Sequence, residues 1–160
     1  MSRINEKVVG RVKMVKLDTR QKGRCGELLV QYCLLKHGVE SAPLTTDTGI
    51  DLVAYSSIGK KPVTIQVKTS SQHDRDGDRW LEWQIPEGCP ADYIAAVDLD
   101  RSIFWLIETK EFNNQARRTS RGKRRLLWAP TGFECKRTRL KEEQFRDYEM
   151  NTAIPKAFGI

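Results

Sequence analysis

Three polar side chains with complementary chemistry stand near one another in the chain: a carboxylate at Asp51, a carboxamide at Gln66 and an ammonium at Lys68. Hard divalent cations such as Mg²⁺ prefer oxygen ligands and keep several water molecules. Asp51, Gln66 and the Val67 carbonyl can supply such oxygens, while Lys68 can orient a water or offset negative charge on phosphorus. This set predicts metal-assisted hydrolysis of a phosphodiester, with Mg²⁺ as the cofactor and Mn²⁺ able to replace it.

Two predicted strands, at about residues 50–55 and 63–69, must bring these groups together. The second stretch alternates apolar and polar residues, which is typical of a strand with one face in the core. Gln66 and Lys68 then share the polar face. A compact turn between the strands pairs Asp51 with Gln66, so the hairpin predicts that the three side chains converge.

A helix is predicted over about residues 20–36, with Asp18 or Thr19 as its N-cap and Gly38 just past its end. Glu27 on this helix can add a metal ligand or position the lysine. The helix has apolar residues on two sides, which predicts that it is largely buried. One stripe contains Cys25, Leu28, Leu29, Tyr32 and Leu35, and the other contains Gly23, Glu27, Val30 and Leu34.

The remaining elements suggest an α/β fold. The stretch 70–78 is rich in Asp and Gly, which predicts an irregular loop. Further strands are predicted at about 80–85, 92–99, 102–108 and 124–130, and helices at about 109–117 and 140–150. We therefore expect a mixed central sheet of about five strands flanked by helices.

The residues around the predicted site resemble the core signature of the PD-(D/E)xK nuclease superfamily. The matching segments are Gly26-Glu27, Gly49-Ile50-Asp51-Leu52 and Ile65-Gln66-Val67-Lys68. The resemblance implies a restriction-endonuclease-like core and a Mg²⁺-dependent DNA endonuclease. It assigns metal ligation to Asp51, Gln66 and Glu27 and the catalytic lysine to Lys68. Two positions depart from the signature: Ile50 replaces proline, and Gln66 replaces an acid and so removes one negative charge from the metal site.

Positive charge is concentrated near the end of the chain. The whole chain has a net charge of +7, and the segment 111–141 alone holds ten Lys or Arg against two Glu. Such a patch attracts polyanions because binding releases condensed counterions. The predicted DNA-binding residues are Arg117, Arg118, Arg121, Lys123, Arg124, Arg125, Lys136, Arg137 and Arg139.

Taken together, these features predict one nuclease domain over residues 1–160, with a core at about 20–116 and a basic DNA-contacting segment at about 117–160. The expected substrate is double-stranded DNA, cut at a specific site by a homing-type or restriction-type enzyme. A Holliday-junction resolvase-like enzyme, an RNA-directed nuclease and a catalytically inactive DNA-binding module stay open as alternatives. Cleavage of both strands normally needs two sites, which favours a homodimer or higher homo-oligomer.

Other features of the composition exclude several classes of protein. No apolar stretch is long enough to cross a membrane, and no secretory signal is visible, so we expect a cytoplasmic protein. Four scattered cysteines and two histidines predict neither a zinc site nor a disulfide framework. No small-molecule cofactor is expected. The four tryptophans are expected mainly in the core, and Gln144 with Tyr148 resembles an accessory motif of the superfamily.

Overall fold

The computed structural model describes residues 16–46, 48–59 and 61–160. In chain order the elements are α1 (Thr19–Lys36), β1 (Val39–Pro43), β2 (Leu52–Ser56), β3 (Val63–Ser70), β4 (His73–Arg75), β5 (Asp78–Pro86), β6 (Tyr93–Asp98), β7 (Ile103–Glu108), α2 (Thr109–Gln115), β8 (Arg117–Arg118), β9 (Lys123–Trp128), the 3₁₀ helix η1 (Glu142–Tyr148) and α3 (Met150–Phe158). The part of the N-terminus that bears on the cytoplasmic prediction, residues 1–15, lies outside the described residues.

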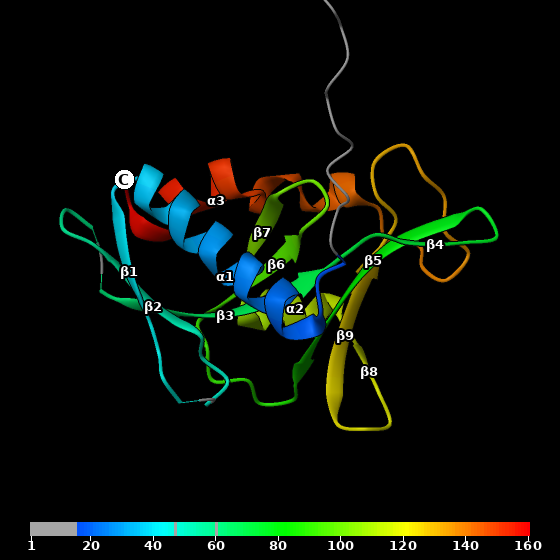
Figure 1. The fold of residues 1–160 in the computed structure, drawn as a ribbon, viewed down its shortest axis with the longest axis horizontal. Helices are drawn as coiled ribbons and strands as arrows, with labels where there is room; N and C mark the ends of the chain where they lie inside the picture. The colour runs from blue at the N-terminus through cyan, green and yellow to red at the C-terminus, as the bar shows by residue number, and fades with distance from the viewer. Residues whose placement is uncertain (1–15, 47, 60) are drawn as a thin grey trace, which may run out of the picture.

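A five-stranded mixed sheet forms the centre of the molecule (Figure 1). Its strand order is β1-β2-β3-β6-β7, and only the β3–β6 pair is parallel. Parallel neighbours need a crossover connection, and here the crossover contains β4 and β5. These two strands pair with β9 and β8 in a second, antiparallel sheet of order β4-β5-β9-β8.

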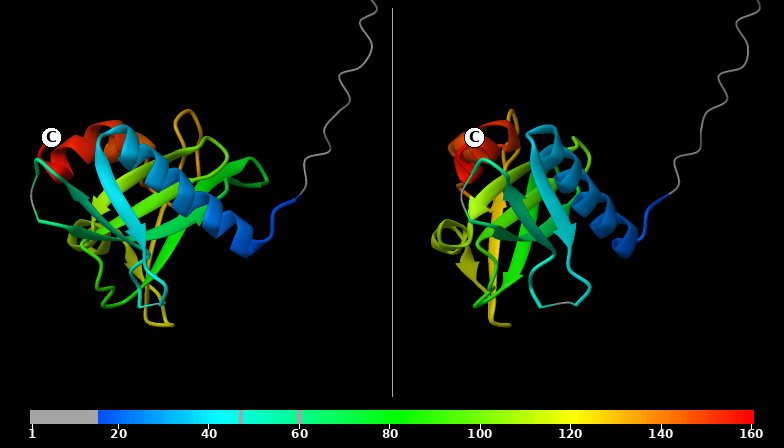
Figure 2. Two further views of the ribbon diagram at one scale, coloured as in Figure 1. Left: turned by 60° about the vertical axis from the view of Figure 1, so that its left-hand side comes forward. Right: turned by 90° about the vertical axis from the view of Figure 1, so that its left-hand side faces the viewer.

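The central sheet is covered on both faces, as the views in Figures 1 and 2 show. On one face, α1 and α3 pack on alternate residues of β3 and β6, such as Ile65, Val67 and Ala95. On the other face, Ile94 and Ala96 pack with β5, β9, α2 and η1. The alternation along β3 therefore directs Gln66 and Lys68 away from the helix layer, toward the side of the second sheet.

Helix α1 begins as predicted. Asp18 is the N-cap and forms a capping box with Gln21, and Gly38 has the left-handed conformation expected just past the end (φ 73°). The prediction that both apolar sides are buried is wrong. The buried side is Gly26, Val30, Cys33 and Leu34, whereas Leu28, Tyr32 and Leu35 are 50–60% exposed.

The second sheet corrects two predictions. The stretch 70–78 is not irregular, because β4 and β5 form a hairpin whose tip, Asp76-Gly77, has positive φ at both residues (54° and 83°). Asp-Gly at such a tip is typical of a type I′ turn. The central sheet does have five strands, but β5 is not one of them. Its place is taken by β1, which was not predicted.

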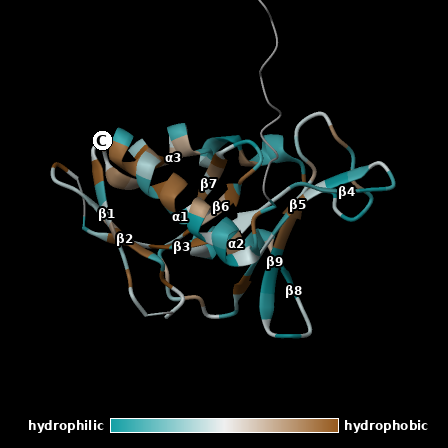
Figure 3. Cartoon of the chain, in the orientation of Figure 1, coloured by the Kyte–Doolittle hydropathy of each residue, from teal (hydrophilic) through white to brown (hydrophobic). Residues whose placement is uncertain are grey.

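The C-terminal part is integrated with the rest of the molecule. β9 pairs with β5 along its whole length, and Trp128 is fully buried among Trp83, Trp105 and Phe145. The predicted helix at 140–150 is instead the 3₁₀ helix η1 followed by α3. Figure 3 shows hydrophilic residues along β4, along β8 and at the start of β9, beside the apolar central strands. Among the described residues, no helix combines the length and apolarity needed to span a membrane.

Candidate active site

The candidate site lies where β2 and β3 separate. The β2–β3 ladder ends at the Leu52–Ile65 pair, in the predicted register. Asp51 N–H then donates to the Ile65 carbonyl at 2.9 Å, and from Gln66 onward β3 pairs with β6 alone among the described strands. At Gln66 and Val67, one side of the β3 backbone therefore faces no other described strand, and the Asp51 side chain lies there instead.

Hydrogen bonds hold the Asp51 carboxylate against β3. Its Oδ2 accepts from the Val67 N–H at 2.7 Å and from the Gln66 Nε2 at 2.5 Å. Gln66 is only 3% exposed, so its side chain stays beside Asp51, where a half-turn of the amide can exchange Nε2 and Oε1. Asp51 and Gln66 thus meet as predicted, but the amide presents its NH₂ group rather than its oxygen to the carboxylate.

An open recess of about 620 Å³ joins these residues to the start of α1. Its lining includes each predicted catalytic and metal-binding residue: Glu27, Asp51, Gln66, Val67 and Lys68. Lys68 is half-buried, which leaves its side chain accessible to a molecule in the recess. Thr69, which follows the lysine, is also in the lining, whereas Ser70 uses its Oγ to accept from the Glu82 N–H.

A close helix–strand contact positions Glu27. A Cβ at Gly26 would lie 1.9 Å from the Thr69 Oγ1, a distance that real structures do not tolerate. Only glycine lets α1 approach β3 this closely, and Glu27 follows directly in the sequence. The Gly-Glu pair therefore has a steric explanation: the glycine brings the helix to the strand and the glutamate reaches the recess.

Three cations of the recess were not selected from the sequence. Arg20, Lys22 and Arg24 line it from the first turns of α1, and Arg24 binds Glu27 at 2.7 Å. Together with Lys68 they outnumber the carboxylates of Glu27 and Asp51 by four to two, which favours an anionic ligand. Their positions seven, five and three residues before Glu27, on a predicted helix, were a usable signal.

The donor set matches a hard cation only in part. Among the described residues no three His, Cys, Asp or Glu side chains gather as a metal site. The Asp51 carboxylate and the Val67 carbonyl are both oxygen donors near the Gln66 amide, which lies 2.5 and 3.4 Å from them. The oxygens required by Mg²⁺ are therefore present, provided that the Gln66 amide turns to present Oε1.

Similarity to solved structures decides the fold. No known protein family and no curated protein matches the sequence at a significant level. The structure is similar to that of the bacterial homing endonuclease I-Ssp6803I, with a TM-score of 0.60 over 84% of this chain and 88% of that chain. This chain has the fold of that homing endonuclease. The predicted restriction-endonuclease-like core is confirmed, and the 18% identity establishes the fold and not the activity.

The predicted DNA-binding residues divide into two groups by their ion pairs. Arg118 and Arg124 both bind the Glu87 carboxylate, at 2.9 and 3.0 Å, and Arg125 binds Glu82 at 2.6 Å. The others are exposed and have no ion pair within the described part of the chain: Arg117, Arg121, Lys123, Lys136, Arg137 and Arg139. Charge for gripping a polyanion therefore resides mainly in the second group.

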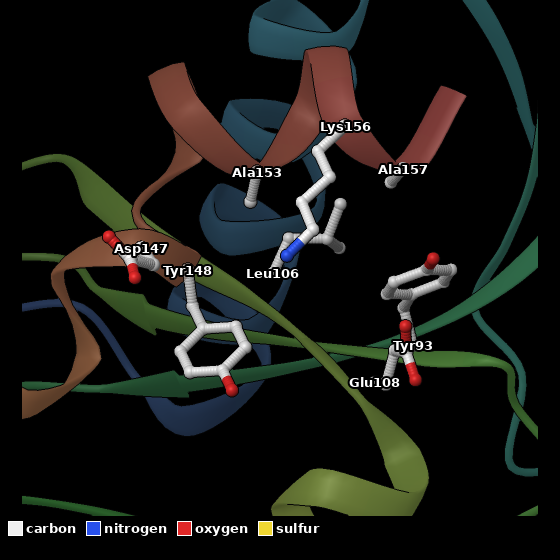
Figure 4. Close-up of a pocket in the computed structure, with 8 residues that line it drawn as sticks. All are labelled: Tyr93, Leu106, Glu108, Asp147, Tyr148, Ala153, Lys156 and Ala157. Carbon is white, nitrogen blue, oxygen red and sulfur yellow. The ribbon is translucent and has the colours of Figure 1, made fainter. Parts of the chain in front are cut away.

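A further cavity lies away from these residues, between α3 and the β6–β7 pair (Figure 4). It has a volume of about 180 Å³, and Lys156 reaches from α3 into the space between Tyr148 and Tyr93. Burial, together with nearby carboxylates such as Glu108, raises the pKa of both tyrosines, so both hydroxyls are protonated at neutral pH. Tyr148 also belongs, with Gln144, to the sequence pair that resembles an accessory motif of the superfamily. Neither residue lines the recess around Asp51, so this pair does not reach it.

The tryptophans and cysteines have structural roles, as expected. All four tryptophans are at least 92% buried, and the ring centroids of Trp128 and Phe145 lie 4.3 Å apart. The four cysteines are free, with Cys33 and Cys135 buried.

Proposed function

We propose that this protein is a metal-dependent DNA endonuclease that hydrolyses phosphodiester bonds at specific sites, as homing enzymes do. One observation carries the proposal: Asp51, Gln66, Lys68 and Glu27 line one recess at the β2–β3 fork of a fold similar to that of a bacterial homing endonuclease. The proposed substrate is double-stranded DNA, and the excess of positive charge in the recess supports it. The cytoplasmic location is part of the proposal.

The residues take complementary roles in this proposal. Asp51, the Gln66 amide oxygen and the Val67 carbonyl would hold Mg²⁺, and Glu27 would add a direct or water-mediated ligand. A bound divalent ion polarises the scissile phosphate and acidifies a water. Lys68 orients the attacking water and offsets charge on phosphorus, and Arg20, Lys22 and Arg24 retain the DNA strand beside it.

Two copies of the chain act together in the proposed enzyme, because a duplex has two strands of opposite direction and each recess serves one. A two-fold homodimer meets that symmetry. Mn²⁺ replaces Mg²⁺ because it accepts the same oxygen ligands.

The test compares three proteins on supercoiled plasmid with Mg²⁺ or Mn²⁺: the natural sequence, Lys68→Ala and Lys110→Ala. We expect nicking and linearisation by the first and a loss of about 10²–10⁴-fold with Lys68→Ala. Lys110 is exposed on α2 outside the recess, so Lys110→Ala should retain full activity. Equal nicking by all three proteins would contradict the assignment of the site.

A catalytically inactive DNA-binding module is the second candidate, and the Gln66 amide favours it. An amide that donates to Asp51 at 2.5 Å satisfies the carboxylate without any metal. Duplex binding without nicking, in every divalent metal tried, would identify the module. A four-way junction and an RNA duplex as parallel substrates separate the resolvase-like and RNA-directed alternatives, since a site-specific enzyme should cut neither efficiently.

A further inference from the structure

A small basic recess lies on the outer face of the second sheet. It has a volume of about 180 Å³ and is bordered by Arg117, Arg125 and Arg139, with Gln115 and Thr138 at its polar edge. This volume is well below the roughly 300–1,000 Å³ of pockets that bind drug-sized ligands. The recess, which we call the arginine recess, therefore suits a small anionic group.

Strand register explains why these arginines face the recess and their neighbours do not. Arg117 pairs with Arg125, and Arg118 pairs with Arg124. Directly paired residues share one face of a sheet, so β8 and β9 place Arg117 and Arg125 on one face and the other pair on the opposite face. Arg118 and Arg124 each form an ion pair there with Glu87, which they share.

The charge of the arginine recess is not balanced. Arg117 and Arg139 are exposed and have no ion pair within the described residues, so Glu82, which binds Arg125, is the one counterion. Arg125 also keeps its Nε buried without a hydrogen-bond partner. Like charges opposite each other on neighbouring strands are destabilising, and an anion between the guanidinium groups would relieve that repulsion.

A chain of contacts connects this recess with the catalytic strand. Ser70, two residues after Lys68 on β3, accepts a hydrogen bond from the Glu82 N–H at 3.4 Å. The Glu82 carboxylate then binds Arg125 at 2.6 Å. Contacts through β5 thus join the catalytic strand β3 to β9, so one DNA duplex can contact both recesses.

We propose that the arginine recess is a pocket for a single backbone phosphate, which anchors the duplex at a fixed distance from the phosphate to be cut. The proposal rests on the proposed function, because DNA is the ligand in both. Guanidinium groups bind phosphate oxygens through paired, charge-assisted hydrogen bonds. Glu82 competes with the phosphate for Arg125, so the occupied pocket exchanges one anion for another.

The experiment measures duplex binding by fluorescence anisotropy in Ca²⁺, with Lys68→Ala in every protein to prevent cleavage. The matched pair is Arg117→Gln and Arg118→Gln, which remove equal charge from adjacent exposed residues on opposite faces of β8. We expect about a tenfold loss of affinity for Arg117→Gln and less than about threefold for Arg118→Gln. Melting temperatures of the variants verify that each is folded.

Two further results test the single phosphate. The double variant Arg117→Gln/Arg139→Gln should reduce the slope of log K against log salt by about one and not two, because both arginines face the same phosphate. Glu82→Gln should raise DNA affinity several-fold, since it releases Arg125. Equal losses for Arg117→Gln and Arg118→Gln, or weaker binding by Glu82→Gln, would overturn the proposal, as would tighter binding of an RNA duplex.

Failure of this proposal and failure of the proposed function give different results. The natural sequence could nick DNA while the Arg117 and Arg139 variants bind DNA as tightly as the Lys68→Ala protein from which they are made. That result would contradict the phosphate pocket and support the nuclease. Alternatively, no metal could support nicking while the Arg117 and Arg139 variants still bind the duplex more weakly. That result would support the phosphate pocket and contradict the nuclease.

Discussion

The recess at the β2–β3 fork and the arginine recess are built on opposite principles. In the first, charges of both signs lie together and hydrogen bonds hold Asp51 against Gln66 and Val67. In the second, three cations surround a space with one counterion, Glu82. The first arrangement depends on single atoms, and the second depends on a sum of charges. Substitutions at the fork should therefore have large effects on stability and DNA cleavage. Substitutions at the arginine recess should have small, graded effects on stability and DNA affinity.

Gly26→Ala should give the largest effect on stability. The new Cβ would collide with Thr69, since 1.9 Å separates its position from the Oγ1. We expect a loss of about 2–3 kcal/mol in the free energy of unfolding and, because Glu27 moves with the helix, a loss of nicking. Urea denaturation measures the first quantity and plasmid nicking the second.

Gly23→Ala is the matched control on the same helix. No atom lies within 4 Å of the position its Cβ would take, so the change should stabilise α1 by about 0.5–1 kcal/mol. If both alanine variants behave alike, the close approach of α1 to β3 does not constrain the site.

Gln66→Glu should give the next largest effect on stability, and the direction of that effect should depend on whether a divalent metal is present. Without metal the new carboxylate would lie beside Asp51, where like charges repel, and we expect a loss of about 1–2 kcal/mol of stability. Mg²⁺ or Mn²⁺ should restore it, because the ion would then have two anionic ligands. Thermal melting with and without metal measures both. A variant that melts at the same temperature in both conditions would argue against metal binding at Asp51.

Glu82→Gln should give the smallest effect, in the arginine recess. Burial raises the pKa of Glu82, but hydrogen bonds from Arg125 and Gln84 outweigh this and the pKa is lowered overall. The ion pair therefore stabilises the fold fully when the pH is above 4.5, the ordinary pKa of a glutamate. This stabilisation is lost as the pH falls through the lower pKa that Glu82 has in the folded protein. At pH 7 the free energy of unfolding of the natural sequence should exceed that of the variant by less than about 1 kcal/mol.

Denaturation at pH 3 supplies the comparison for Glu82, since the two proteins should converge there. Glu40→Gln, at an exposed residue of β1, should show no such convergence. A difference that persists at pH 3 would mean that packing, and not charge, dominates at Glu82.

The local part of the candidate site could be predicted from the sequence because short-range rules determine it. A compact turn determined the pairing of Leu52 with Ile65, and alternation placed Gln66 and Lys68 on one face. Asp18 and Gly38 marked the ends of α1. Each of these features depends on residues close in the chain.

Features that depend on distant partners could not be predicted. Two apolar stripes on α1 left open which one is buried, and only packing with α3 and the sheet selects Val30 and Leu34 over Leu28 and Tyr32. Alternation in β5 identified a strand but not its sheet. The charge count identified a basic segment, whereas the β8–β9 register determines which arginines share a face.

The two borders of the central sheet differ in a way that affects the behaviour of concentrated samples. Beside β7, Glu149 forms a bridge with Trp105, so the junction of η1 and α3 covers part of that border. The border at β1 is five residues long, with Glu40 exposed and Pro43 at its end. Proline lacks an N–H group and a charged side chain opposes flush stacking of strands. Growth of fibrils by addition of chains to this border is therefore disfavoured.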